Sequence, residues 1–197
     1  HGDQAIEQGW RLKLRRHVFQ YRANHAAQAL AEQISCQGRM RGVDFMRVHL
    51  LDGSPLCNRA GLGRIGRAVA TRALAFGMDI SYTGRTPKSD VAYRWCADAR
   101  TLAAGVDFLV VCASGGTATR GLINRDVLAA LGPAGVLVNV GRGSIVDEEA
   151  LLEALQERHI LAAGLDVFCH EPHIAQGLLA LENVVLTPHI ASMTGAT

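Results

Sequence analysis

Three polar residues follow short apolar segments in the C-terminal third of the sequence. Arg142 comes after GVLVNV, Glu171 after GLDVF and His189 after VVLT. An arginine offers a planar fork for a carboxylate or a polarised carbonyl, and a histidine can give up a proton near neutral pH. A glutamate beside that histidine would orient its ring and favour its protonated form. Together these residue types can do acid–base chemistry on a carbonyl compound that carries a carboxylate.

Each of these residues also has an ordinary structural interpretation. Arg142 can cap loop carbonyls, Glu171 can be a surface residue, and His189 can be a loop histidine whose hydrogen bonds are satisfied. The catalytic interpretation is favoured because all three occur in the same chain as a glycine-rich loop, which makes coincidence a poor explanation.

That loop is the segment GLGRIG, which matches the pattern G-x-G-x-x-G and opens a helix. In a dinucleotide-binding loop Gly61 would permit the tight turn, and Gly63 would let the backbone approach a pyrophosphate. Gly66 would let the helix pack close to a sheet. The N-terminus of the helix then offers N–H groups and a positive dipole end to the phosphates. We expect Arg64 and Ile65, within the loop, to belong to the cofactor site as well.

The elements that would position these residues are helices alternating with short apolar strands. The predicted strands are 79–83, 108–112, 135–140, 162–168 and 184–187, and the predicted helices are 65–76, 125–131 and 147–158. Near-continuous apolar strands are typical of a parallel sheet covered on both faces. The pattern therefore predicts an α/β fold, a doubly wound parallel sheet of the Rossmann type. Ligands of such sheets lie outside the carboxyl ends of the strands, where the three polar residues would converge.

The strand that should precede the glycine loop is hard to find in the sequence. A buried strand is expected directly before Gly61, but the segment there reads DGSPLCNRA. Pro55, Asn58 and Arg59 are poor residues for a central strand. We therefore expect the first strand to be weak or displaced.

The end of the second predicted strand bears on the choice of nucleotide. An acidic residue there would hold the adenosine ribose of NAD, but Thr83 is followed by Gly84, Arg85 and Thr86. An arginine can pair with a 2′-phosphate and a hydroxyl can donate to it, whereas a carboxylate would repel it. The sequence thus predicts a preference for NADP (NADPH), with NAD possible. The alternative is that Arg85 is a surface residue that stacks on adenine.

Three further residues are candidates for the cofactor side of the site. Ser114 and Thr119 follow the FLVVC strand, in a segment that can equally be a flexible turn. Asp166 ends the GLDV strand, where its carboxylate can accept from a nicotinamide carboxamide or hold the neighbouring loop. Cys112 and Cys169 lack a paired base, so we expect neither to be a nucleophile.

Composition excludes several classes of function. The net charge is only +2, which predicts no nucleic-acid partner, and no apolar run approaches the ~18 residues of a membrane span. Five scattered cysteines form no metal or disulfide framework, which favours reduced thiols in a cytoplasmic protein. His170 and His173, three residues apart in a loop with a proline, are a weak metal motif, so no metal site is predicted.

Four segments resemble a known family in order, spacing and residue type. GLGRIG, LVNVGRGSIVDEEALLEAL, AAGLDVFCHEP and NVVLTPHIAS are similar to the cofactor domain of the D-isomer-specific 2-hydroxyacid dehydrogenases. The resemblance implies that Arg142, Glu171 and His189 form the catalytic set. The ending Gly84-Arg85-Thr86 resembles the NADP-using glyoxylate/hydroxypyruvate reductase branch, which includes hydroxyphenylpyruvate reductases. The implied chemistry is hydride transfer between NADPH and C2 of a small 2-oxo acid, with the reverse reaction on a D-2-hydroxy acid, in a homodimer.

The resemblance covers residues 61–197, and residues 1–60 depart from it. Residues 1–59 carry nine Lys and Arg against five Asp and Glu, whereas residues 60–197 carry 11 against 13. The family has a substrate domain mostly before the glycine loop, for which residues 1–60 are too short. We expect 1–60 to be an atypical segment, a remnant or non-family sequence, before a dinucleotide-binding domain at 61–197. The alternatives to a working enzyme are a nucleotide-binding sensor of the corepressor kind and an inactive dehydrogenase fragment.

Overall fold

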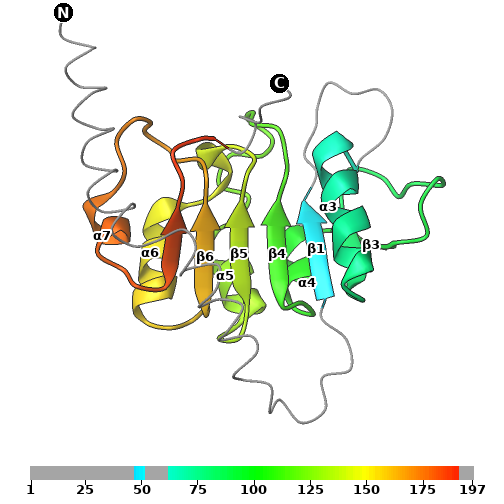
Figure 1. Cartoon of the computed structure of the whole chain (residues 1–197), viewed down its shortest axis with the longest axis horizontal. Coiled ribbons are helices and arrows are strands. Elements are labelled where there is room, and N and C mark those ends of the chain that lie inside the picture. Colours follow the sequence, from blue (N-terminus) through cyan, green and yellow to red (C-terminus); the bar gives the residue numbers. More distant parts are fainter. Residues whose placement is uncertain (1–46, 52–61, 191–197) are drawn as a thin grey trace, which may run out of the picture. The chain divides into compact units, whose positions relative to one another are not determined.

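The structure of the chain is a computed structural model that describes residues 47–51 and 62–190 (Figure 1). All described residues belong to one unit of the chain, Phe45–Thr197. This unit is a parallel sheet with helices on both faces. No helix within the described ranges has the length and apolar character needed to cross a membrane.

The sheet of the described residues has the strand order β3-β2-β1-β4-β5-β6-β7, and every neighbouring pair is parallel. Its strands are β1 Arg47–Leu51, β2 Asp79–Thr83, β3 Arg94–Cys96, β4 Phe108–Val111, β5 Val136–Asn139, β6 Ala162–Leu165 and β7 Val184–Leu186. Successive strands add outward from β1 first in one direction and then in the other, which is the doubly wound topology. The predicted fold class is confirmed.

The helices occupy the connections between strands. They are α3 Arg64–Ala75, α4 Ala99–Ala103, α5 Arg125–Leu131, α6 Glu148–Gln156 and α7 Gln176–Leu179, with a 3₁₀ turn, η1, at Gly143–Ile145. Asp98, Asn124 and Asp147 cap α4, α5 and α6, because each side chain accepts a hydrogen bond from a backbone N–H in the first turn. These caps fix where each helix starts after its strand.

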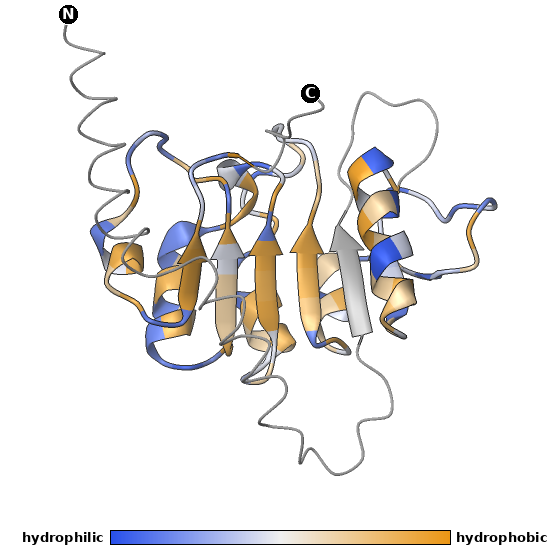
Figure 2. Ribbon diagram, in the orientation of Figure 1, coloured by the Kyte–Doolittle hydropathy of each residue, from blue (hydrophilic) through white to orange (hydrophobic). Residues whose placement is uncertain are grey.

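The core is buried on both faces of the sheet, as strand β4 shows. Leu109 and Val111 point into the larger core cluster, which includes side chains of α4, α5 and α6. Val110 points into a second cluster, which includes Ala70 of α3 and Tyr82 of β2. In Figure 2 the strands β4 and β5 are correspondingly coloured as largely hydrophobic. Burial on both faces explains why the strands read as continuous apolar runs rather than alternating ones.

The first strand is displaced upstream of the position where the motif would put it. β1 comprises RVHLL, pairs with β2 on one side and β4 on the other, and is an inner strand of the sheet. The segment 52–60, with Pro55, separates it from the glycine loop. The sheet therefore takes one inner strand from before residue 61, within the part of the chain that the composition sets apart.

Three short elements were missed by the sequence pattern. β3, α4 and α7 have three, five and four residues, respectively. Elements of this length span at most about one helical turn or one strand repeat, so hydrophobic periodicity does not reveal them.

Candidate active site

The candidate catalytic residues follow three neighbouring strands at the carboxyl edge of the sheet. Arg142 lies after β5, Glu171 in the segment after β6 and His189 after β7. The strand arrows visible in Figure 1 point to this edge. Parallel pairing of β5 with β6 and β6 with β7 thus brings together residues that are 47 positions apart in the sequence.

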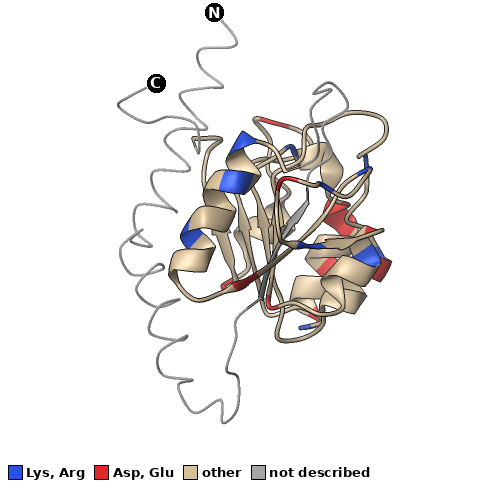
Figure 3. Cartoon of the chain, turned by 90° about the vertical axis from the view of Figure 1, so that its right-hand side faces the viewer, with Lys and Arg blue, Asp and Glu red and all other residues tan. Residues whose placement is uncertain are grey.

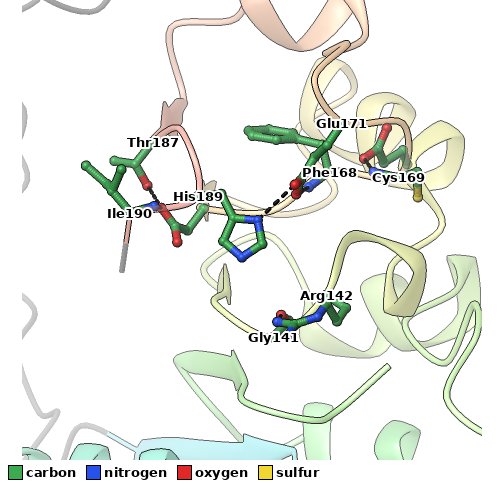
Figure 4. A network of polar contacts seen from close by, with 10 residues as sticks. Gly141, Arg142, Phe168, Cys169, Glu171, Thr187, His189 and Ile190 are labelled. Atoms are coloured by element: carbon green, nitrogen blue, oxygen red, sulfur yellow. Dashed lines mark hydrogen bonds and ion pairs between the residues drawn. The ribbon is translucent and has the colours of Figure 1, made fainter. Parts of the chain in front are cut away.

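Glu171 and His189 form a hydrogen-bonded pair (Figure 4). The Nδ1 atom of His189 lies 2.8 Å from Oε2 of Glu171, and both side chains are partly exposed. The other carboxylate oxygen, Oε1, accepts a hydrogen bond of 2.9 Å from the backbone N–H of Phe168. An ionised carboxylate only accepts, so His189 donates from Nδ1–H. The pair orients the imidazole and leaves Nε2 as the atom that can exchange a proton with a ligand.

The backbone around His189 is held by a buried carboxylate. Oδ1 of Asp166, a residue 5% exposed, accepts from Thr187 Oγ1 at 2.5 Å and from the Ile190 N–H at 3.0 Å. Between these two anchors His189 has φ +53°, in the left-handed region that non-glycine residues rarely adopt. Asp166 therefore holds the loop, as in the structural interpretation of this residue, and its contact with a nicotinamide stays a prediction.

Arg142 is held through its backbone by Asn139, the last residue of β5. Asn139 is 1% exposed; its Nδ2 donates to the Arg142 carbonyl and its Oδ1 accepts from the Gly141 N–H, both at 3.1 Å. The Arg142 side chain is exposed, and its Nη1 donates to the Gly141 carbonyl at 2.7 Å. In the view of Figure 4 it lies below the His189 ring. Sequence reasoning missed Asn139, although a polar residue ending an apolar strand is a usable signal.

Gly141 and Gly143 let the segment that carries Arg142 fit between its neighbours. A Cβ at Gly141 would lie 2.6 Å from the Ala113 carbonyl oxygen, in the loop after β4. A Cβ at Gly143 would overlap the backbone of Phe168, which holds Glu171. The two glycines around Arg142 are therefore required by close backbone approach.

The described part of the glycine loop suits a phosphate group. Gly63 is the N-cap of α3, no side chain caps this helix start, and the first turn contains no acidic residue. The free backbone N–H groups at the start of α3, together with the positive end of the helix dipole, can bind an anion. Gly66 is buried, whereas Arg64 and Ile65 are exposed. Gly61 lies outside the described residues.

The segment after β2, residues 84–90, is called the β2 loop here. Arg85 and Thr86 are exposed in it, and the Gly84 carbonyl accepts from Trp95 Nε1 at 3.2 Å. The backbone N–H of Lys88 donates to the buried Tyr82 hydroxyl at 2.6 Å. Two hydrogen bonds thus shape the loop while its predicted phosphate ligands stay accessible.

In the loop after β4, Thr119, which the sequence analysis placed on the cofactor side of the site, has a structural role. Thr119 is buried, and its hydroxyl lies 3.0 Å from the Ser114 carbonyl oxygen and 3.2 Å from that of Gly116. Ser114 itself is exposed. Gly115 lies against the stem of Arg142, since a Cβ there would come within 3.0 Å of Arg142 Cγ. This loop therefore borders the candidate catalytic residues.

Cys169 is a poor nucleophile in this environment. Burial, with the nearby Glu148 carboxylate as a further cause, raises the pKa of its thiol to about 11. The Sγ atom lies 3.6 Å from the Val146 carbonyl oxygen. The thiol is therefore protonated at neutral pH.

Within 62–190 and 47–51, no group of three or more His, Cys, Asp or Glu side chains is placed to hold a metal ion.

Comparison with known proteins identifies the family. The profile of the D-isomer specific 2-hydroxyacid dehydrogenase, NAD binding domain, matches residues 12–191. The chain is 50% identical over 137 residues to glyoxylate/hydroxypyruvate reductase A of Arabidopsis thaliana, covering 70% of this chain and 44% of that protein. It is 46% identical over 138 residues to 2-ketogluconate reductase of Gluconobacter oxydans, with coverages of 70% and 44%.

A solved structure agrees with this relationship. The NADPH-dependent glyoxylate/hydroxypyruvate reductase of Sinorhizobium meliloti, in complex with NADP and malonate, superposes with a TM-score of 0.72 at 42% identity. The superposition covers 86% of this chain and 53% of that structure, and the chain spans less than half the length of the two curated relatives above. The chain belongs to the D-isomer specific 2-hydroxyacid dehydrogenase family, and the part that matches is its NAD binding domain.

Proposed function

We propose that this chain carries the cofactor half of an oxidoreductase that transfers hydride between NADP(H) and C2 of a small 2-oxo or D-2-hydroxy acid, such as hydroxypyruvate or glyoxylate. The observation that carries the proposal is the Glu171–His189 pair, at 2.8 Å, at the carboxyl edge of the sheet that also bears the glycine loop. The names of the relatives and the NADP bound to the S. meliloti enzyme support the substrate class and the nucleotide.

The residues present fit a nicotinamide dinucleotide. The N–H groups at the start of α3, after Gly63, would hold the pyrophosphate. Arg85 and Thr86 would hold the 2′-phosphate, and the segment from Ser114 to Thr119 would line the nicotinamide side. When bound, the nucleotide supplies the hydride for reduction or accepts it for oxidation.

His189 acts as the general acid in the reduction direction. It carries protons on both ring nitrogens, donates from Nδ1 to Glu171, and gives the Nε2 proton to the substrate oxygen as the carbonyl becomes a hydroxyl. In the oxidation direction the neutral Nε2 takes the hydroxyl proton. Glu171 fixes the ring orientation and stabilises the protonated imidazole in both directions.

Arg142 binds the substrate carboxylate and polarises the ketone. Its guanidinium has five N–H donors, of which Nη1 supplies one to the Gly141 carbonyl, so donors remain for two oxygens of the substrate. Asn139 fixes the backbone on either side of this residue, which keeps the guanidinium at the edge where His189 lies.

For the domain organisation we propose residues 61–197 together with β1 as the dinucleotide-binding domain. For the residues before β1 we propose a segment of atypical composition, which the family profile nevertheless matches from residue 12. We also propose a homodimer, in keeping with the family resemblance of the cofactor domain.

Turnover of NADPH with hydroxypyruvate and with glyoxylate, followed by nicotinamide absorbance, tests the function. The wild type should oxidise NADPH in the presence of either acid. His189→Gln should bind NADPH as the wild type does but turn over about 10²–10⁴-fold more slowly, because only the proton transfer is removed. His173→Gln, an exposed histidine three residues from His170 in the same region, is the matched control. Equal rates for wild type and His189→Gln would contradict the proposed role.

A further inference from the structure

Glu148, the first residue of α6, makes a hydrogen bond outside its own helix. Its Oε1 atom accepts from the backbone N–H of Cys169 at 2.6 Å, 21 positions along the chain, in the segment that carries Glu171. Glu148 is half-buried at this contact. A hydrogen bond from a backbone N–H to a carboxylate is stronger than one to a neutral acceptor. Glu148 therefore joins two segments that follow different strands of the sheet.

The start of α6 does not depend on the Glu148 side chain. Asp147 is the N-cap, and its Oδ1 accepts from the Ala150 N–H at 3.1 Å. Exposed Glu149, in the same first turn, also supplies a negative charge to the positive end of the helix dipole. Figure 3 marks such acidic residues in red on the helices across the sheet from α3, whose charged residues are all basic. The contact with Cys169 is what distinguishes Glu148 within this acidic turn.

The peptide group that Glu148 binds lies directly beside the one that binds Glu171. The Phe168 N–H donates to Glu171 Oε1 at 2.9 Å, and the next N–H along the chain, that of Cys169, donates to Glu148 (Figure 4). The other oxygen of Glu171 lies 2.8 Å from His189 Nδ1. A shift of this short stretch of backbone would therefore displace the Glu171 carboxylate and, through it, the imidazole.

The segment that ends at Glu148 begins at the candidate ligand of the substrate carboxylate. Arg142 is followed by the turn η1 and, six positions later, by Glu148. Within this segment Gly143 packs on the Phe168–Cys169 peptide, since a Cβ at Gly143 would overlap the atoms of that peptide. The packing of Gly143 limits how closely the two segments approach, and the hydrogen bond of Glu148 limits how far they separate. Together the two contacts fix the spacing between the segment of Arg142 and that of Glu171.

We propose that Glu148 is a positioning residue for the hydride-transfer reaction, which holds the Phe168–Cys169 peptide and so sets the distance between Arg142 and the Glu171–His189 pair. The inference rests on the proposed function and adds to it a residue that acts through the backbone rather than on the substrate. The carboxylate and the reacting oxygen of a 2-oxo acid are on adjacent carbons, so the groups that bind them must keep a fixed spacing. A misplacement approaching 1 Å can lower turnover by about 10²-fold.

Three variants separate positioning from charge and from helix stability. Glu148→Ala removes the acceptor of the Cys169 N–H, whereas Glu148→Gln keeps an acceptor oxygen and removes only the charge. Glu149→Ala is the matched control, because it removes the same kind of side chain from the same helical turn. A thermal melt of each variant shows that it is folded. Glu148→Met, which keeps the side-chain length without an acceptor, replaces Glu148→Ala if the latter does not fold.

The first measurement is nuclear magnetic resonance of the full chain without nucleotide. At mildly alkaline pH the imidazole nitrogen resonances report which nitrogen carries the proton, and His189→Gln assigns them. The wild type should show the proton on Nδ1 of His189, held by Glu171. Glu148→Ala should move this proton in part to Nε2 and speed hydrogen exchange of the Phe168 and Cys169 amides about tenfold. Glu148→Gln and the control should match the wild type.

The second measurement is NADPH oxidation with hydroxypyruvate. Glu148→Ala should lower kcat about tenfold and leave the KM for NADPH unchanged, because the glycine loop is at another part of the sheet edge. Glu148→Gln should recover most of the lost kcat. A merely structural Glu148 would lower the melting temperature and leave both the His189 proton and kcat as they are.

The outcomes separate this inference from the proposed function. If the wild type oxidises NADPH with neither hydroxypyruvate nor glyoxylate, the proposed function is wrong and this inference falls with it. If the wild type is active, the positioning role requires that Glu148→Ala change both kcat and the position of the His189 proton. A change in only one of them, or in neither, would overturn the role of Glu148 while the proposed function stands.

Discussion

Replacing Gly141 by alanine should disturb the position of Arg142 by a calculable amount. The new Cβ would lie 2.6 Å from the Ala113 carbonyl oxygen, whereas ordinary contact begins at 3.4 Å. The backbone must therefore move by about 0.8 Å, because both partners are main-chain atoms and no rotamer change relieves the overlap. The same residue donates to Asn139 and accepts from Arg142, so the movement strains both hydrogen bonds.

The expected costs follow from that displacement. Overpacking of this kind costs about 1–3 kcal/mol, and about 2 kcal/mol lowers Tm by roughly 4–8 °C in a chain of this size. A misplacement approaching 1 Å at a substrate-positioning residue can lower turnover by about 10²-fold. Thermal melts and NADPH oxidation with hydroxypyruvate measure the two effects.

Gly164→Ala is the matched control for this substitution. Gly164 is in β6, and a Cβ there would meet only Val138 Cγ2, at 4.0 Å, which is ordinary contact. Its Tm should stay the same or rise slightly, because alanine restricts the unfolded chain. Equal losses of Tm in Gly141→Ala and Gly164→Ala would refute the close-approach argument.

Three further substitutions or titrations test other parts of the account. Asn139→Ala leaves the Arg142 carbonyl and the Gly141 N–H without their partner, so the free energy of unfolding measured in urea should fall by about 1–3 kcal/mol. An unchanged free energy would show that these two hydrogen bonds do not stabilise the segment that carries Arg142. Because burial raises the pKa of Cys169 to about 11, its alkylation by iodoacetamide, mapped by mass spectrometry, should be slow at neutral pH and accelerate only as pH nears that value; fast alkylation at neutral pH would contradict this. Since Arg67 lowers the pKa of Asp90, Arg67→Met should raise that pKa toward its ordinary value in an NMR titration, and no change would argue against the ion pair.

Much of the sheet could be predicted because it is buried on both faces. Strands such as Phe108–Val111 and helices such as Arg125–Leu131 are continuous or periodic enough to appear in the sequence. The strand RVHLL could not be located, since it has five residues and DGSPLCNRA separates it from the glycine loop that normally marks it. Only its pairing with β2 and β4 identifies it as an inner strand of the sheet.

Some features of the candidate site could likewise be predicted from the sequence, and others could not. Because both residues follow strands of the predicted parallel sheet, the sequence was enough to expect Glu171 and His189 at one edge, where the structure places Nδ1 of His189 2.8 Å from Oε2 of Glu171. The burial of Lys88 and the contact between Arg67 and Asp90 depend on how α3 packs against the β2 loop. The sequence alone does not show how these elements pack. The catalytic and cofactor roles of the site residues stay predictions.

The central claim is that this sheet binds a nicotinamide dinucleotide and presents an acid–base pair to it. A fluorescence titration of the wild-type chain with NADPH and with NADH, followed by addition of hydroxypyruvate in the same cuvette, tests it most directly. We expect saturable NADPH binding that is tighter than NADH binding, and loss of NADPH fluorescence when the acid is added. Absence of binding by either nucleotide would contradict the claim.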